Sequence, residues 1–147
     1  MSEELRIFLA EDNPADAFLI KQALSFANLQ FNLCRVEDGE AALRALEKVE
    51  QEKTPPSVIL LDLNLPKISG HELLARVRSS EQLRTTPVIV LTSSDSPDDR
   101  ARTAALKISH YFRKPSEFKE FLRLGKIVER VCRNAGPKQQ EEGLAGA

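Results

Sequence analysis

The segment 58–66, which reads VILLDLNLP, constrains the fold more than any other part of the chain. Four apolar residues in a row predict a short buried strand, and Pro66 cannot belong to a central strand ladder. The carboxylate of Asp62 follows directly on that apolar run. Ligands of open parallel sheets collect outside the carboxyl ends of the strands, so Asp62 is a candidate for chemistry. For an isolated aspartate, a helix cap or an ordinary loop position is the commoner role.

Similar short apolar runs alternate with segments of helical periodicity along the whole chain. The expected strands are 5–10, 31–36, 58–62, 88–91 and 109–113, and the expected helices are 14–27, 40–49, 71–79, 96–107 and 116–133. Short apolar strands joined by crossover helices form a parallel sheet that is covered on both faces. The sequence therefore predicts a doubly wound α/β fold, which does not by itself give a function.

Three helix starts carry recognisable capping signals. Asn13 precedes Pro14, which suits an N-cap followed by proline at the first helical position. Ser69 is followed three residues later by Glu72, as in a capping box. Ser96 precedes a proline and two aspartates, which also predicts a helix start.

Length and charge narrow the class of protein. The chain has 147 residues, 41% of them hydrophobic, and a formal net charge of -1. This length is enough for one domain, which we expect at 1–133, followed by a disordered tail at 134–147. The net charge gives no reason to expect binding to nucleic acid. An acidic start and the lack of a 20-residue apolar run argue against a signal peptide and a membrane span. Cys34 and Cys132 are expected to be reduced packing residues, which favours the cytoplasm.

Polar residues stand at four predicted strand ends: Glu11 with Asp12, then Asp62, Thr92 and Lys114. Taken alone, the first two acids would simply be favourable charges near a helix N-terminus. If the strand ends converge, however, three carboxylates require a cation among them, and this ligand set suits Mg²⁺. A carboxylate can attack phosphorus to give an aspartyl phosphate, while an ammonium and a hydroxyl neutralise the phosphoryl oxygens. The set therefore predicts a phosphoacceptor site.

These motifs also match a known family in order and spacing. Glu-Asp at 11–12, LDLNLP at 61–66 with Gly70 beyond, LTS at 91–93, and Tyr111 three residues before Lys114-Pro resemble the receiver domain of bacterial two-component response regulators. The resemblance covers residues 5–131. Because the tail after residue 133 is too short to fold an output domain, we expect a stand-alone receiver. The resemblance also implies the flavodoxin-like and CheY-like strand order 2-1-3-4-5.

The resemblance implies a role for each site residue. Asp62 would accept a phosphoryl group from a sensor histidine kinase. Mg²⁺ would be held by the carboxylates of Glu11, Asp12 and Asp62 and by the backbone carbonyl of Asn64. Lys114 would bind a phosphoryl oxygen. The chain would be no enzyme in the usual sense, because it would catalyse only its own phosphorylation and dephosphorylation.

The resemblance also implies a switch. Thr92 would bind a phosphoryl oxygen, and the ring of Tyr111 would turn inward with it. The Lys114–Pro115 peptide bond is expected to be cis. Within the family, the motifs most resemble small regulators paired with phytochromes and related sensor kinases.

The last helix leaves two interpretations open. The apolar residues Leu124, Ile127 and Val131 widen its apolar arc beyond one face, which fits either a wide core face or a homodimer or partner surface shared with the fifth strand. Gly125 in the helix interior indicates close packing. His71 is expected at the surface or at a strand edge, not at a metal.

Three rivals remain. An Asp-based phosphatase would need an acid at the position of Asn64, which cannot transfer protons. A flavodoxin-type flavin site would need a phosphate loop after the first strand, where Glu11 and Asp12 would repel phosphate. The third is a degenerate receiver that binds partners without phosphorylation, against which the complete set of site residues argues.

Overall fold

The computed structural model describes residues 4–135 as five strands and six helices in strict alternation until the last helix. The strands are β1 (Leu5–Ala10), β2 (Phe31–Val36), β3 (Val58–Asp62), β4 (Val88–Thr92) and β5 (His110–Arg113). The helices are α1 (Pro14–Phe26), α2 (Gly39–Glu52), α3 (Gly70–Arg78), α4 (Pro97–Ala105), α5 (Phe118–Phe121) and α6 (Arg123–Asn134). The expected tail lies outside the described residues, apart from its first two.

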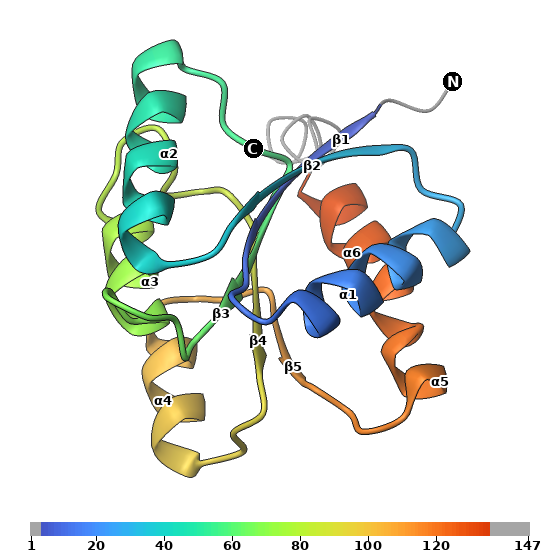
Figure 1. Cartoon of the computed structure of the whole chain (residues 1–147). Helices are drawn as coiled ribbons and strands as arrows, with labels where there is room; N and C mark the ends of the chain where they lie inside the picture. Colours follow the sequence, from blue (N-terminus) through green and yellow to red (C-terminus); the bar gives the residue numbers. More distant parts are fainter. Residues whose placement is uncertain (1–3, 136–147) are drawn as a thin grey trace, which may run out of the picture.

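All neighbouring strands pair in parallel, in the order β2-β1-β3-β4-β5. Helices α2, α3 and α4 cover one face of this sheet, and α1, α5 and α6 cover the other (Figure 1). The doubly wound fold and its strand order are therefore confirmed. Parallel pairing brings all five carboxyl ends of the strands to one edge of the sheet, which is where the candidate residues stand.

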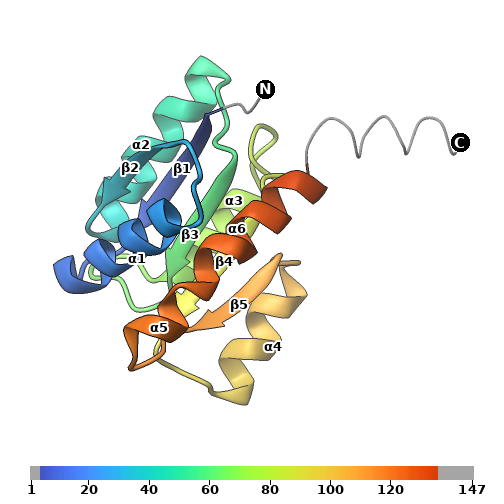
Figure 2. The same ribbon diagram turned by 90° about the vertical axis from the view of Figure 1, so that its right-hand side faces the viewer.

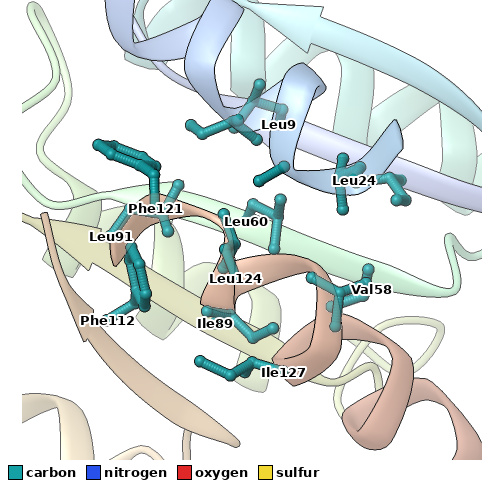
Figure 3. Packing of buried hydrophobic residues seen from close by; sticks show 14 of the residues in the cluster. Leu9, Leu24, Val58, Leu60, Ile89, Leu91, Phe112, Phe121, Leu124 and Ile127 are labelled. Atoms are coloured by element: carbon teal, nitrogen blue, oxygen red, sulfur yellow. The ribbon is translucent and has the colours of Figure 1, made fainter. Parts of the chain in front are cut away.

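The core has one apolar cluster on each face of the sheet. On one face, Leu60 and Ile89 pack against Leu24 of α1 and Leu124 of α6 (Figure 3). On the other face, residues of α2 and α3 pack on the opposite side chains of β3 and β4. Every residue of β3 and β4 is buried, which explains why these segments are apolar almost throughout rather than alternating.

The predicted helix starts are confirmed by hydrogen bonds to the capping side chains. Asn13 Oδ1 accepts from the backbone N–H of Ala15 at 2.8 Å. Ser69 Oγ accepts from the N–H of Glu72 at 3.2 Å. Ser96 caps α4 in the same way. These caps fix where α1, α3 and α4 begin, and all three begin beside the candidate site.

The single last helix predicted for 116–133 is instead two helices. The N–H of Gly125 donates to the carbonyl of Leu122, three residues back, so the regular hydrogen-bond ladder is interrupted between α5 and α6. Both helices cover the same face of the sheet (Figure 1). Phe121 of α5 packs there against Phe112 of β5. Figure 2 shows α6 running alongside α1 on this face of the sheet.

The close packing expected at Gly125 is confirmed. A Cβ built there would lie 2.5 Å from the carbonyl oxygen of Ala23 and 2.7 Å from Ala27 Cβ, both on the α1 side. Gly125→Ala should therefore lower the free energy of unfolding by about 1–2 kcal/mol, because overpacking outweighs the gain of about 1 kcal/mol in helix propensity. Urea denaturation followed by circular dichroism measures this. The exposed Lys126→Ala is the control, and equal or higher stability of Gly125→Ala would contradict the close contact.

The wide apolar arc of the last helix serves the core. Leu124 and Ile127 are 0% and 6% exposed, and Val131 packs at the border of the same cluster. Of the two interpretations, the core face is confirmed for these residues. Both cysteines are free, as expected, but Cys34 is exposed and so is not a packing residue. None of the helices described between residues 4 and 135 is long and apolar enough to cross a membrane.

Candidate functional site

The strand ends at the carboxyl edge of the sheet bring the predicted residues together. Glu11 directly follows β1, Asp62 is the last residue of β3, and Lys114 directly follows β5. The Lys114 ammonium lies 2.8 Å from Glu11 Oε1 and 2.9 Å from Asp62 Oδ2. Carboxylate oxygens of Glu11, Asp12 and Asp62 all lie within 4.8 Å of one another. The predicted convergence of one ammonium and three carboxylates is therefore observed in the structure.

Burial shifts the pKa values of these charged groups. Glu11 is 0% exposed and Asp62 is 4% exposed, whereas Asp12 faces solvent. Burial, together with the charge of nearby Asp62, raises the pKa of Glu11 to about 7, although Lys114 acts against this rise. Burial alone would lower the pKa of Lys114, but its carboxylate partners outweigh that effect, so the pKa lies above the ordinary value. Lys114 is thus a permanent ammonium beside a carboxyl that ionises reluctantly.

The backbone around Asp62 holds its carboxylate in place. Asp62 Oδ1 accepts from the N–H of Asn64 at 2.9 Å, while Oδ2 faces Lys114. Gly70, at the start of α3, donates its N–H to the carbonyl of Leu63 at 3.0 Å. A Cβ at Gly70 would lie only 2.4 Å from the backbone oxygen of Asp62. The lack of a side chain at Gly70 is therefore what lets α3 begin directly against the end of β3.

Thr92 and Tyr111 meet through a third residue, Ser94. Thr92 is fully buried at the end of β4, and its hydroxyl oxygen accepts from the N–H of Ser94 at 3.0 Å. The Tyr111 hydroxyl donates to the backbone carbonyl of Ser94 at 2.9 Å. The guanidinium of Arg100 lies 4.3 Å from the centre of the Tyr111 ring, close enough for a cation–π contact. The Lys114–Pro115 bond is trans, so the expectation of a cis bond was wrong.

Asp16 is a site residue that the sequence interpretation missed. Its Oδ2 accepts from the Lys114 ammonium at 2.9 Å, so Lys114 contacts three carboxylates at once. Asp16 stands in the first turn of α1, four residues after Asp12. The first turn of a crossover helix lies beside the carboxyl end of its strand, so an acid at this spacing was the available signal.

The donor set fits a hard divalent cation. Glu11 Oε1 is buried and lies 2.8 Å from Lys114, yet it has no aligned hydrogen bond among the described residues. One ammonium does not neutralise three clustered carboxylates, so a bound cation would offset the remaining negative charge. Oxygen ligands in this number suit Mg²⁺ or a similar ion, which keeps several of its waters.

The raised pKa of Glu11 predicts a pH dependence of stability in the metal-free protein. The folded-state pKa of about 7 exceeds the ordinary 4.5, so the fold favours the protonated carboxyl. Its contribution, on the order of 3 kcal/mol, is complete below the ordinary pKa and is lost as the pH rises through the folded value. Urea denaturation in EDTA across this range measures it, with Glu11→Gln as the control. An identical pH dependence in Glu11→Gln would contradict the assignment.

Comparison with known proteins identifies the family. Residues 7–124 match the response regulator receiver domain. The chain is 41% identical over 118 residues to the probable methanogenesis regulatory protein FilR2 of Methanothrix harundinacea, covering 80% of this chain and 76% of that protein. It is 36% identical over 125 residues to response regulator Rcp1 of Synechocystis sp., covering 84% and 85%. The chain belongs to the family of response regulator receiver domains.

Solved structures agree with this. The phosphorylated cyanobacterial phytochrome response regulator RcpA superposes with a TM-score of 0.81 at 33% identity, covering 91% of this chain and 97% of that one. The Mn²⁺-bound form of Rcp1 superposes with a TM-score of 0.75 at 35% identity, covering 85% and 91%. Receiver domains act as phosphoryl acceptors, interact with histidine kinases and bind a divalent metal at an acidic pocket. In this chain, Glu11, Asp12 and Asp62 form an acidic cluster whose carboxylate oxygens could hold a metal ion.

Proposed function

We propose that Asp62 accepts a phosphoryl group from a phosphohistidine of a sensor histidine kinase, in a reaction that requires Mg²⁺. The observation that carries this proposal is the position of the Lys114 ammonium, 2.8 Å from Glu11 and 2.9 Å from Asp62, with all three side chains almost fully buried. A carboxylate that is fixed beside a permanent ammonium can act as a nucleophile towards an anionic phosphoryl group, because the ammonium offsets the repulsion between the two anions.

Each site residue has its own role in the proposed phosphoryl transfer. A carboxylate oxygen of Asp62 forms the new bond to phosphorus as the phosphorus–nitrogen bond of the phosphohistidine breaks. The bonding electrons return to the imidazole nitrogen, which can then take up a proton. Lys114 stabilises the charge on one phosphoryl oxygen, and the hydroxyl of Thr92 can donate to another. When bound, Mg²⁺ would neutralise further phosphoryl charge, held by Glu11, Asp12, Asp62 and the carbonyl of Asn64.

We propose that residues 1–133 form the receiver unit. We also propose that the protein acts in the cytoplasm, where sensor kinases expose their phosphohistidine. The similarity to RcpA, a cyanobacterial phytochrome response regulator, supports a phytochrome-like kinase as the donor. Neither nucleic acid nor a membrane is needed for this function.

The output surface is proposed to be the face formed by α4, β5 and the last helical segment, which comprises α5 and α6. A groove of about 570 Å³ runs across this face, lined by Tyr111 and Arg100 at one side and by Glu120 and Arg123 at the other. Lys114 also lines the groove, so the phosphorylation site and the outer face share one surface. A change at Thr92 and Tyr111 would therefore alter a surface on which a partner or a second copy of the chain can bind.

Intact mass after incubation with acetyl phosphate tests the proposal. Wild-type protein with Mg²⁺ should gain the mass of one phosphoryl group, and protein in EDTA should gain none. Asp62→Asn should gain none under either condition, because an amide is not a nucleophile towards phosphorus. If the wild-type protein gains nothing with Mg²⁺ either, the chain is a receiver that binds its partners without phosphorylation.

A further inference from the structure

Helix α4 is held to the rest of the molecule by few apolar contacts. Thr103 is its only buried residue, although the helix has nine residues. Apolar burial of this extent cannot fix a helix firmly, and helices at the low end of local stability are the ones able to move. Polar contacts at the start of α4 must therefore contribute much of what positions it.

Those polar contacts centre on Asp99 in the first turn of α4. Asp99 Oδ1 lies 2.9 Å from Nε2 of His71, and Asp99 Oδ2 accepts from the Ser94 hydroxyl at 2.8 Å. Both hydrogen bonds hold the pKa of Asp99 below its ordinary value, with His71 the larger cause, so the group is a carboxylate. A carboxylate only accepts, so Nε2 of His71 carries the proton and donates it.

His71 stands in the first turn of α3 and is not the surface residue that its sequence context suggested. Its side chain is only 12% exposed. Its Nδ1 is buried and has no hydrogen-bond partner among residues 4–135, so the contact with Asp99 is what holds the ring. The preceding residue, Gly70, packs directly on the backbone of Asp62. The helix that carries His71 therefore begins in contact with the end of β3, the strand that carries Asp62.

Ser94 completes the connection. Its hydroxyl bonds Asp99, its N–H bonds the Thr92 hydroxyl oxygen, and its carbonyl accepts from Tyr111. A continuous chain of contacts thus runs from the end of β3 through α3 and α4 back to the end of β4. It links Asp62 to the pair Thr92 and Tyr111 by a route that does not pass through the phosphoryl group.

We propose that His71 and Asp99 are positioning residues for the switch. Their hydrogen bond, called the His71–Asp99 tie below, attaches α4 and Ser94 to the start of α3 and thereby holds Ser94 where it connects Thr92 with Tyr111. The existence of this tie follows from the contacts alone. Its role in signalling rests on the proposed function. When Thr92 moves, Ser94 and α4 must move against α3, so the strength of the tie would set how far the change at Thr92 reaches Tyr111.

The tie can be tested without phosphorylation. His71→Leu puts an apolar side chain of similar size in place of the imidazole and removes the donor to Asp99. We expect the Ser94 amide to exchange its hydrogen about fivefold faster, as for the loss of one hydrogen bond, in hydrogen exchange measured by NMR. Tyr111 is the only tyrosine in a chain without tryptophan, so its fluorescence should report the same loosening. His71→Gln, whose amide can also donate to Asp99, should restore both signals.

Asp98→Ala is the matched control. Asp98 is 79% exposed and pairs only weakly with Arg102 at 3.8 Å, so its loss removes an acid from the first turn of α4 without touching His71 or Ser94. Unchanged Ser94 exchange and Tyr111 emission in His71→Leu would overturn the proposal. An equal change in Asp98→Ala would overturn it as well, because it would mean a general loosening of α4. If His71→Leu does not fold, Asp99→Ala, with Asp99→Asn as its rescue, tests the same tie from the other side.

A second arm tests the role in signalling. With acetyl phosphate and Mg²⁺, the change in Tyr111 emission on phosphorylation should be smaller in His71→Leu than in wild type, at equal phosphoryl incorporation by mass. An equal change would overturn the signalling role while leaving the tie intact. If wild type itself is not phosphorylated, the proposed function fails, and the exchange measurement still decides on the tie.

Discussion

Lys114→Met should lower the free energy of unfolding of the metal-free protein by about 3–5 kcal/mol, as expected when one partner of a buried ion pair is removed. Methionine fills a similar volume but leaves the buried carboxylates of Glu11 and Asp62 without the ammonium between them. The same change should slow phosphorylation by acetyl phosphate about 10²- to 10³-fold, because one preorganised charge is lost from the site. Urea denaturation in EDTA and intact mass over time measure the two effects.

Lys67→Met is the control for the loss of a lysine. Lys67 also faces two carboxylates, Asp38 at 3.6 Å and Glu40 at 3.4 Å, but its side chain is 55% exposed. Its replacement should change stability by about 1 kcal/mol or less. Adding Mg²⁺ should recover part of the stability lost in Lys114→Met but not in Lys67→Met. Equal stability losses in the two variants would contradict the claim that the buried Lys114 contributes more to stability than the exposed Lys67.

Gly70→Ala should lower the free energy of unfolding by about 3 kcal/mol, at the upper end for overpacking. The added Cβ would lie 2.4 Å from the backbone oxygen of Asp62 and 2.5 Å from Leu63 Cα, and backbone atoms cannot turn away as a side chain can. Relief of the clash must displace α3 from the end of β3. Phosphorylation of Asp62 should therefore slow as well, when measured at a temperature at which the variant is folded.

Gly125→Ala is the matched control for this second effect. It also places a methyl group against a helix backbone, at Ala23, but on the face packed by α1 and α6. Both variants should lose stability, and only Gly70→Ala should lose phosphorylation rate. A normal rate in Gly70→Ala would mean that the start of α3 does not position Asp62.

The strand ends were predictable because two independent signals coincide there. Apolar runs such as 58–61 mark buried parallel strands, and the polar residue that follows each run must then lie at the carboxyl edge of the sheet. Glu11, Asp12, Asp62 and Lys114 were all placed in this way, and the structure brings them together. The caps at Asn13, Ser69 and Ser96 were predictable because capping depends on neighbouring residues only.

Features that depend on contacts across the sheet were not predictable in this way. The spacing of Asp16 after Asp12 could place it beside the strand end, but its partner Lys114 is far away in the sequence, so their hydrogen bond was not predicted. His71 was expected at the surface or at a strand edge because no neighbouring motif requires a histidine, yet Asp99 of another helix holds its side chain in a position where only 12% of it is exposed. The division of the last helix into α5 and α6 depends on how α1 and β5 are packed beneath it, which helical periodicity does not report.

The most direct test of the central claim is to find which residue carries the phosphoryl group. Borohydride reduces an acyl phosphate and marks the former aspartate as homoserine, which peptide mass spectrometry can locate after incubation with acetyl phosphate and Mg²⁺. The account predicts the mark at Asp62 alone, and its absence in EDTA. A mark at Asp12 or Asp16, or a modified protein with no reducible residue, would contradict the assignment of Asp62 as the phosphoacceptor.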